Sequence, residues 1–460
     1  MKPSKKTLYE FFETFAKERG DDVFLFDETQ VYTVKQALSA AKSLAKQMRD
    51  AGVKQGDFVA VQTKRTVKNI LLFYALQFLN GVAVLFEPRE KGKRMNFMTD
   101  GEAFFVGEQR ILLDFSPKET KIGFPSDSRQ TSIVIFTSGS TGESKAVQLS
   151  QYNFINNSLD TQSIGGYRKD DINILIVPIH HVFGLALIMT AVVTQHAVFV
   201  PSEVDFDYIL DCMERYGVTR LNGVPSMYLA MAERKGTRKI STLNCGLIAG
   251  APCSKEQFLK IEHDLGITLV TVYGMSECVG ISCGNYKDNV DDRCDNVGRI
   301  YSMNEVKIAP DGEILVKGPT VTAGYLTEQG SVEVTDADGW LHTGDLGELD
   351  GEGFLHIGGR KKDIIIRNGN NLSSVAIEQK LLRLNGVKDV AVVGISDPRE
   401  GEVPCAMIVT DGTAVSDAFL LTVLNKLEMP KHYAQVEKIP LTASGKADKQ
   451  KITKFFERSE

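Results

Sequence analysis

The 460-residue sequence lacks the features that mark several protein classes. Its net charge at pH 7 is −6, so it has no overall positive field to attract nucleic acid. The most apolar stretch, residues 185–200, is interrupted by Thr190, Thr194 and His196 and falls short of the ~18 apolar residues that a membrane span needs. No apolar run of the kind found in secretory signals follows Met1. We therefore expect no nucleic-acid partner, no membrane span and no signal peptide.

Cysteine shows neither a disulfide pattern nor a metal-binding pattern. The seven cysteines are an odd number and include no CxxC pair. Cys278, Cys283 and Cys294 come closest to a cluster, but no histidine lies at a zinc-ligand spacing beside them. Reduced structural thiols are typical of a reducing compartment, so a cytoplasmic location is predicted.

Runs of strand length alternate with helical patterns over the first 280 residues. Thr33 and Gln36 form a capping box for a helix that Gly52 ends, and a second, more apolar helix is expected over 67–79. This alternation predicts parallel sheets covered by helices on both faces. The expected strands lie at 58–61, 82–86, 132–136, 172–177, 197–200, 245–249 and 268–272.

The pattern changes after about residue 290. Short runs at 306–308, 313–316 and 354–357 are separated by turns rich in glycine and aspartate. Short strands with such turns are typical of antiparallel pairing. A small antiparallel unit is therefore expected after the parallel sheets.

The last hundred residues read as a separate α+β module, with helices expected over 374–384 and 416–427. The Gly-Gly and basic stretch at 358–362 is the best candidate for a domain boundary. The predicted fold is α/β: a large N-terminal domain of parallel sheets covered by helices plus the antiparallel unit, residues 1–360, and a small, mobile C-terminal α+β domain, residues 361–460.

One segment has the composition of a phosphate-binding loop. Residues 137–145 contain glycines and hydroxyl side chains, end in Lys145, and follow the apolar run 132–136. Glycines let backbone N–H groups approach an anion, hydroxyls add donors, and lysine adds positive charge. Lys145 lies three residues after Gly142, which differs from the common P-loop. A flexible linker would rarely follow a buried strand, so we expect this loop to hold a nucleoside triphosphate.

A second candidate follows the strand at 268–272. Tyr273 can stack on a base, Ser276 can bond a phosphate and Glu277 can hold Mg²⁺. Taken alone, the same pattern also fits an ordinary capped turn.

Two charged residues lie in or beside the antiparallel unit. Asp345 ends a Thr-Gly-Asp turn, and its carboxylate can accept bonds from both hydroxyls of a ribose. Arg360 suits the same ribose or a phosphate. The alternatives are an ordinary turn for Asp345 and a solvent-exposed charge beside Lys361 and Lys362 for Arg360.

Two further segments carry candidate side chains. Lys446 lies on a small-residue loop near the C-terminus, where a mobile cation can neutralise charge that develops in a transition state. His180 and His181 follow the strand expected at 172–177. Adjacent side chains on a strand point to opposite faces, so one histidine is expected in a pocket, the other packed outward, and no shared metal.

In order and content, these segments resemble the motifs of the adenylate-forming superfamily of acyl-CoA synthetases, aryl-CoA ligases, luciferases and adenylation domains. The resemblance covers essentially the whole chain. It rests on the phosphate loop at 137–147, the segment Gly250-Ala251-Pro252, Tyr-Gly-Met-Ser-Glu at 273–277, Trp-Leu-His-Thr-Gly-Asp at 340–345, the hinge segment at 359–371 and the terminal Ser-Gly-Lys at 444–446.

The resemblance implies an enzyme that uses ATP and Mg²⁺ to join AMP to a small-molecule carboxylic acid and then passes the acyl group to a thiol, with coenzyme A as the favoured acceptor. Lys446 would bridge the α-phosphate and the attacking carboxylate, His181 would lie along the acyl pocket with residues 224–226, Glu277 would hold Mg²⁺, and Lys362 would be the hinge. The implied nucleotide contacts are Thr137, Ser138, Gly139, Ser140, Thr141, Gly142 and Lys145 for the β- and γ-phosphates; Gly250, Ala251, Pro252 and Tyr273 for adenine; Gly274, Met275 and Ser276 in the segment beside the α-phosphate; and Asp345 and Arg360 for the ribose.

The chain departs from the family pattern at several positions. Ser144 and Ala146 replace the usual proline and glycine of the phosphate loop. Residues 371–377 lack the usual proline and first glutamate, although Glu378 is kept. The thioester-forming step is therefore less firmly predicted than adenylation.

Three functions remain open. The first is a CoA ligase, and the second is an adenylation enzyme that loads the pantetheine thiol of a carrier protein. The first is favoured because residues 181–184 lack the aspartate that amino-acid-activating members use for the substrate amine. The third is a nucleotide-binding paralogue without activity. The acid is not identified, although Gly223, Gly246 and Gly280 would leave room for a ring or a chain.

Overall fold

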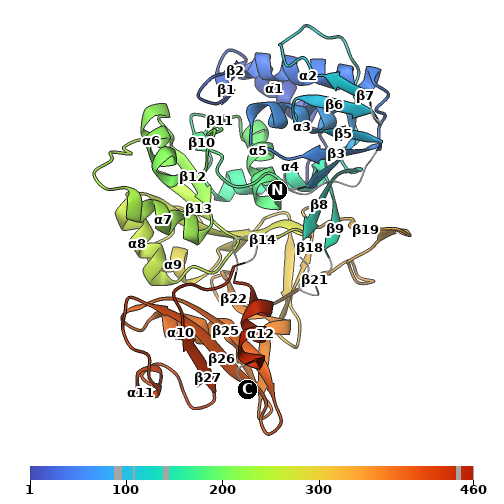
Figure 1. Ribbon diagram of the computed structural model, residues 1–460. Coiled ribbons are helices and arrows are strands. Elements are labelled where there is room, and N and C mark those ends of the chain that lie inside the picture. Colours follow the sequence, from blue (N-terminus) through green and yellow to red (C-terminus); the bar gives the residue numbers. More distant parts are fainter. Residues whose placement is uncertain (87–95, 107–108, 138–143, 442–446, 459–460) are drawn as a thin grey trace.

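The computed structural model describes residues 1–86, 96–106, 109–137, 144–441 and 447–458. In Figure 1 the strands and helices from β23 onward, in orange and red, form a smaller unit beside the rest of the chain. The five predicted loop residues from Ser138 to Gly142, and also Lys446, lie outside the described residues. No helix among the described residues has the length and apolar character needed to cross a membrane.

The first nine-stranded sheet is parallel at its centre and antiparallel at its edges. β10 pairs in parallel with β11 and β12, and the parallel pairing continues through β13 to β14. The order across the sheet is β16 (Arg299–Ile300), β15 (Cys278–Cys283), β14 (Thr268–Met275), β13 (Cys245–Ile248), β12 (Arg220–Gly223), β10 (Ile172–Ile174), β11 (Ala197–Phe199), β1 (Val23–Phe26) and β2 (Val31–Thr33).

The second nine-stranded sheet follows the same plan. β5, β3, β4 and β8 are parallel, and antiparallel strands extend the sheet at both edges. Its order is β20 (Gly330–Val332), β19 (Gly324–Thr327), β9 (Lys145–Ser150), β8 (Thr131–Thr137), β4 (Val82–Phe86), β3 (Phe58–Gln62), β5 (Phe97–Thr99), β6 (Ala103–Val106) and β7 (Gln109–Leu112). The predicted parallel sheets are confirmed, and their antiparallel edges are an addition that the sequence reading missed.

Helices pack against these sheets around one continuous hydrophobic cluster. Every residue of α3 except Lys68 is buried, because this helix lies in the interior rather than on the surface. The capping box predicted for α2 is present, with Thr33 and Gln36 each accepting a backbone N–H bond from the other residue. The helices of this part are α1 (Leu8–Arg19), α2 (Val34–Asp50), α3 (Val67–Leu79), α4 (Gln151–Ile164), α5 (Val182–Thr194), α6 (Phe206–Tyr216), α7 (Pro225–Arg234), α8 (Lys255–Leu265) and α9 (Val290–Asp295).

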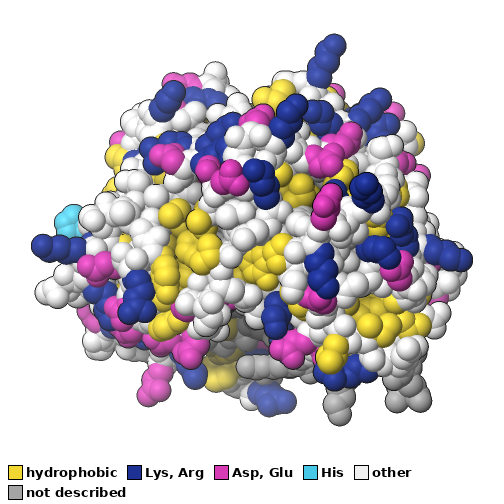
Figure 2. Space-filling model, turned by 90° about the horizontal axis from the view of Figure 1, so that it is seen from above, with side chains coloured by type: hydrophobic (Ala, Val, Ile, Leu, Met, Phe, Trp, Pro, Cys, Tyr) yellow, Lys and Arg dark blue, Asp and Glu magenta, His cyan; other side chains and the backbone are white. Residues whose placement is uncertain are grey.

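One outer face of this part is displayed in Figure 2. There, Lys and Arg side chains are interspersed with Asp and Glu side chains around scattered hydrophobic ones. This mixture agrees with the modest net charge of the whole chain.

The predicted antiparallel unit is a four-stranded sheet. Its strands, in order, are β17 (Glu305–Ile308), β18 (Glu313–Lys317), β21 (Leu341–Leu349) and β22 (Leu355–Arg360). Its apolar side packs against Cys278 and Ile281 of β15. This contact brings β21 and β22 next to the end of the first large sheet.

The last part of the chain has a sheet and a core of its own. Both of its hydrophobic clusters draw their buried members from Ile365 onward. A short 3₁₀ turn, Lys361–Asp363, connects it to β22. The domain division after residue 360 stays a prediction. The elements of this part are β23 (Ile364–Arg367), β24 (Asn370–Ser373), α10 (Ser374–Leu382), β25 (Val387–Asp397), β26 (Gly401–Thr410), α11 (Asp417–Leu420), β27 (His432–Gln435) and α12 (Lys449–Glu457).

The helix expected over 416–427 is much shorter than its apolar pattern suggests. The observed helix, α11, ends at Leu420. The Asn425 side chain accepts bonds from the backbone N–H groups of Leu427 and Glu428, at 2.9 and 3.0 Å. The Arg367 guanidinium donates a hydrogen bond to the Leu427 carbonyl at 2.8 Å. Such side-chain bonds compete with helical ones and hold the segment in turns.

Candidate functional site

Three of the predicted nucleotide contacts meet at the junction of two sheets. The register of β21 and β22 places Asp345 opposite Arg360, and Arg360 Nε lies 2.7 Å from Asp345 Oδ1. Tyr273 on β14 donates its hydroxyl to the other oxygen, Oδ2, at 2.6 Å. Burial holds the pKa of Tyr273 well above its usual value, so the hydroxyl remains a donor. Asp345 is thus held at both oxygens by residues far from it in the sequence.

Asp345 is also fixed by the backbone around it. Its amide donates to Thr343 Oγ1 at 3.0 Å, and that hydroxyl donates to the Ile314 carbonyl at 2.8 Å. The Asp345 side chain is only 7% exposed, whereas Arg360 is 43% exposed. A ligand can therefore reach the guanidinium more easily than the carboxylate, and ribose hydroxyls would have to share Asp345 with its present donors.

The predicted metal ligand lies in the turn between β14 and β15. A side chain at Gly274 would meet the Val279 carbonyl at 2.4 Å, so only glycine lets these strands come this close. Ser276 and Glu277 form the turn that follows. Tyr325 donates its hydroxyl to Glu277 Oε1 at 2.7 Å. The described residues form no ion pair with Glu277, so a hard oxygen ligand is available for a divalent cation.

The base of the predicted phosphate loop is described, although its tip is not. Thr137 and Lys145 are cross-strand partners in β8 and β9, and Ser144 Oγ donates to the Thr137 carbonyl at 2.8 Å. The Lys145 ammonium lies 4.8 Å from the centre of the Tyr325 ring. The structure therefore brings Lys145 and Glu277 to the same tyrosine.

The reading of the sequence missed Tyr325. A lone Gly-Tyr pair in a short strand has no distinctive spacing, and nothing in the sequence connects residue 325 with residues 145 or 277. The connection comes from the pairing of β19 with β9, which places Tyr325 opposite Val147.

The segment expected to flank adenine follows β13. Gly250 has a φ of +84°, and a side chain there would meet Val224 Cγ1 at 3.3 Å. Ala251 and Pro252 are exposed. The adenine segment and residues 224–226, expected along the acyl pocket, are therefore neighbours.

The histidine pair departs from its predicted arrangement. β10 ends at Ile174, so His180 and His181 lie in the turn before α5 rather than on a strand. Their rings are 4.4 Å apart, and His180 Nδ1 lies 3.2 Å from Thr63 Oγ1. Burial lowers the pKa of His180 and favours its neutral form. The expectation of opposite faces was wrong because a turn does not alternate its side chains as a strand does.

Two of the glycines expected to open the acyl pocket are already in close contact with tyrosines. A side chain at Gly246 would meet the Tyr228 hydroxyl at 2.2 Å, and one at Gly280 would meet Tyr301 Cε2 at 2.5 Å. Gly223 has ordinary contacts with Tyr228. Gly246 and Gly280 therefore allow tyrosines to pack closely against the backbone.

The hinge region carries several charges. Lys361 pairs with Asp311 at 2.6 Å and with Glu313 at 3.0 Å, both in the antiparallel unit. Burial lowers the pKa of the neighbouring Lys362. Asp363 pairs with Lys449 at the start of α12, at 2.8 Å.

Lys446, the predicted catalytic lysine, belongs to the segment 442–446. Lys446 itself lies outside the described residues. Leu441 and Ala447, on either side of this segment, form a β-bridge, and the Asp448 amide donates to the Pro440 carbonyl at 2.8 Å.

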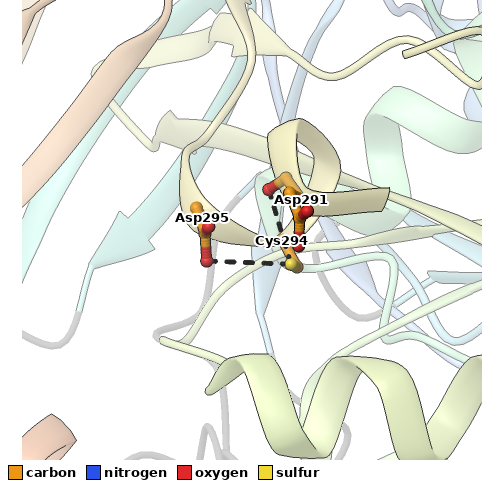
Figure 3. A group of neighbouring side chains, drawn as sticks. All are labelled: Asp291, Cys294 and Asp295. Atoms are coloured by element: carbon orange, nitrogen blue, oxygen red, sulfur yellow. Dashed lines mark hydrogen bonds between the residues drawn. The ribbon is translucent and has the colours of Figure 1, made fainter. Parts of the chain in front are cut away.

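A cluster with metal-ligand chemistry lies away from these residues, on α9. Asp291, Cys294 and Asp295 approach one another in Figure 3. Lys255 Nζ pairs with both carboxylates, at 2.6 and 3.2 Å. The two negative charges are thus shared with an ammonium group, and the cluster is separate from Glu277.

Comparisons with known proteins identify a family and relatives that match most of the chain. The family model of the AMP-binding enzyme matches residues 12–106 and 100–326, and that of the AMP-binding enzyme C-terminal domain matches residues 376–446. The chain is 31% identical over 457 residues to a 2-succinylbenzoate–CoA ligase of Bacillus thuringiensis subsp. konkukian, covering 94% of this chain and 95% of the relative. A ligase of the same name from Bacillus cereus (strain AH820) matches with the same identity and coverage.

Solved structures share the fold over nearly the whole chain. ATP-bound MatB from Rhodopseudomonas palustris has a TM-score of 0.86 at 23% identity, covering 98% of this chain and 99% of that chain. O-succinylbenzoate coenzyme A synthetase (MenE) from Bacillus subtilis, in complex with ATP and magnesium ion, has a TM-score of 0.82 at 23% identity, covering 96% and 98%. At this identity the two solved structures show only that the fold is shared. The enzyme family is shown by the family models.

Proposed function

The chain belongs to the AMP-binding enzyme family, and from this premise we propose that it joins 2-succinylbenzoate, or an aromatic keto-dicarboxylic acid much like it, to coenzyme A. Family membership and the ligase relatives confirm the enzyme class predicted from the sequence, an AMP-forming acid–thiol ligase. We propose that it uses ATP, Mg²⁺ and coenzyme A. The observation that carries the choice of acid is the 31% identity to 2-succinylbenzoate–CoA ligases over 94% of this chain.

The reaction divides into two balanced steps. A substrate carboxylate oxygen attacks the α-phosphorus of ATP, the bond to the bridging oxygen breaks, and pyrophosphate leaves. The thiol of coenzyme A then attacks the acyl carbon, the bond to the AMP oxygen breaks, and AMP leaves as the thiol loses its proton. A carboxylate alone reacts poorly with a thiol because it lacks a good leaving group, which AMP supplies.

The first step brings two anions together, so the site must supply positive charge and donors. In our proposal Lys145 and the loop before it hold the β- and γ-phosphates, Asp345 and Arg360 hold the ribose, and Lys446 lies between the α-phosphate and the carboxylate. The chemistry of Glu277, an oxygen ligand with no cation paired to it among the described residues, fits Mg²⁺, which when bound neutralises phosphate charge.

Thioester formation, the second step, requires a different protein surface next to the α-phosphate than adenylation does. We propose that residues 361–460 rotate about Lys362, withdrawing Lys446 after adenylation. The support is that a single short turn, Lys361–Asp363, joins β22 to the small unit, and that each side has its own hydrophobic cluster. Lys361 reaches back to Asp311 and Glu313, so these ion pairs would break or re-form when the unit rotates.

Acid-dependent ATP–pyrophosphate exchange tests the proposal. We expect exchange with 2-succinylbenzoate and far less with benzoate, succinate, malonate and palmitate. With 2-succinylbenzoate and ATP, addition of coenzyme A should give a thioester and AMP. Release of ADP, or exchange that is stronger with another acid of the panel, would contradict the assignment.

The same assay separates the alternatives. A carrier-protein loader would acylate a pantetheinylated carrier in preference to coenzyme A, and the relatives named as CoA ligases favour coenzyme A. A paralogue without activity would bind ATP but exchange pyrophosphate with no acid.

A further inference from the structure

Tyr325 contacts two residues that the proposed function places on one ATP–metal complex. Its hydroxyl bonds the Glu277 carboxylate, and its ring lies beneath the Lys145 ammonium. We propose that Tyr325 is a positioning residue: its hydroxyl orients the metal-binding carboxylate and its ring holds the phosphate-binding lysine. The inference rests on the proposed function, which names the two ligands but assigns no part to Tyr325.

The hydroxyl fixes the carboxylate from one side. It donates to Glu277 Oε1 at 2.7 Å, and no other side chain in the described part of the chain is recorded as bonding this carboxylate. Partners that orient a metal ligand in this way typically change metal affinity or activity by about 10- to 100-fold when they are lost.

The backbone of the same strand segment holds Glu277 as well. The Thr322 amide donates to the Glu277 carbonyl at 2.8 Å. Thr322 is anchored in turn, because its hydroxyl bonds the Gln148 carbonyl on β9. Glu277 is therefore held through both its main chain and its side chain by residues 322–325.

The ring of Tyr325 reaches Lys145 through the register of β19 and β9. Tyr325 pairs with Val147, and Lys145 lies two residues before Val147, so all three side chains share one face of the sheet. Such diagonal neighbours are within reach of an aromatic ring. The ammonium lies 4.8 Å from the ring centre, within the distance of a cation–π contact.

Two substitutions separate the two contacts. Tyr325→Phe removes the hydroxyl and keeps the ring, whereas Tyr325→Leu removes both. Tyr208→Phe is the matched control, because Tyr208 donates to Glu28 Oε1 at 2.6 Å in a similar tyrosine–glutamate bond that plays no part in the proposed site. Each protein is tested without acid, so that no turnover occurs.

The measurement is the rise in melting temperature caused by ATP, first with EDTA and then over a MgCl₂ series. For Tyr325→Phe we expect the shift with ATP and EDTA to match wild type, and the MgCl₂ concentration for half of the additional shift to rise about 10- to 100-fold. For Tyr325→Leu the shift with ATP and EDTA should fall as well. Tyr208→Phe should match wild type in both conditions.

A double variant tests whether the hydroxyl acts through Glu277. Adding Tyr325→Phe to Glu277→Gln should produce no further change in the MgCl₂ dependence, because the carboxylate that the hydroxyl orients is gone. A Tyr325→Phe protein with the wild-type MgCl₂ dependence, or an effect that persists in full on Glu277→Gln, would overturn the proposal. Failure of the proposed function looks different: wild type would show the Mg²⁺-dependent shift but no acid-dependent pyrophosphate exchange.

Discussion

Asp345 in the large part of the chain is buried and Glu378 in the small part is half-buried, and the two carboxylates are held differently. Asp345 is bonded at both oxygens, by the Tyr273 hydroxyl and the Arg360 guanidinium. Glu378 accepts a bond from the Val392 amide at 2.8 Å, while the Lys449 ammonium bonds Asp363 and Ser374. Burial raises the pKa of Glu378 to about 7.

The two carboxylates are held differently because their hydrogen-bond partners belong to different kinds of structure. Asp345 and Arg360 are cross-strand neighbours, so strand register holds a charged pair together. Glu378 projects from α10 toward β25 and meets a backbone donor. The proposed nucleotide side thus holds an ion pair in place by strand register, whereas the small unit contains a carboxyl group whose charge depends on pH.

The largest expected effect concerns Lys446, which we propose acts on the nucleotide during adenylation. Lys446→Ala should slow adenylation by about 10²–10³-fold, the usual cost of losing one aligned group that stabilises transition-state charge. Thioester formation from preformed adenylate should change little. Both half-reactions are measured, and Lys451→Ala, an exposed lysine in α12, is the control. Equal loss in both half-reactions would contradict the separate roles of the two regions.

The next effect concerns the stability contributed by Glu378. Its folded-state pKa lies above the unfolded value, so between about pH 4.5 and 7 the folded protein binds more protons, and the free energy of unfolding falls as pH rises. By pH 8 the titration of Glu378 lowers the free energy of unfolding by ~3 kcal/mol. Glu378→Gln keeps an acceptor for the Val392 amide, and in urea unfolding it should lose this pH slope and exceed wild type at pH 8.

Asp397→Asn is a control of opposite sign, because Lys431 holds the pKa of Asp397 at about 2. That variant should be less stable than wild type at pH 7, and the difference should shrink as the pH falls below about 4. Identical pH slopes for wild type and Glu378→Gln would mean that Glu378 does not titrate in this range.

The smallest effect tests the fixed charges of the nucleotide side. Asp345→Asn keeps one acceptor but loses the charge that holds Arg360, so the KM for ATP should rise about 10- to 100-fold, as for ~1.5–3 kcal/mol of charged hydrogen bonding. Asp350→Asn is the control, because Asp350 lies at the other end of the same hairpin and bonds His356 at 2.9 Å. A KM for ATP that is unchanged in Asp345→Asn would remove Asp345 from the nucleotide site.

Much of the fold was predictable because local signals and tertiary packing agree. The capping box at Thr33 is present, and the continuous apolar run at 67–79 became the buried helix α3. The prediction failed where local and tertiary bonds compete. The segment after Leu420 has a helical pattern, but Asn425 and Arg367 bond its backbone and hold it in turns.

The site was predictable in part. Asp345 and Arg360 were predicted to bind one ribose and Tyr273 to contact adenine, and the structure bonds all three side chains to one another through Asp345. Tyr325 could not be found, because its partners lie 48 and 180 residues away, as the sequence numbering gives. The histidine pair was misread because the strand before it ends earlier than its apolar run.

The family could be predicted from the sequence through the resemblance of its motifs to a known superfamily, because glycines, hydroxyls and charged residues at strand ends form local patterns. Which of these side chains meet depends on the packing of the whole chain. Strand register placed Arg360 against Asp345, and the pairing of β19 with β9 placed Tyr325 beside Lys145. Register depends on how whole sheets pack, so no spacing within a single segment encodes it.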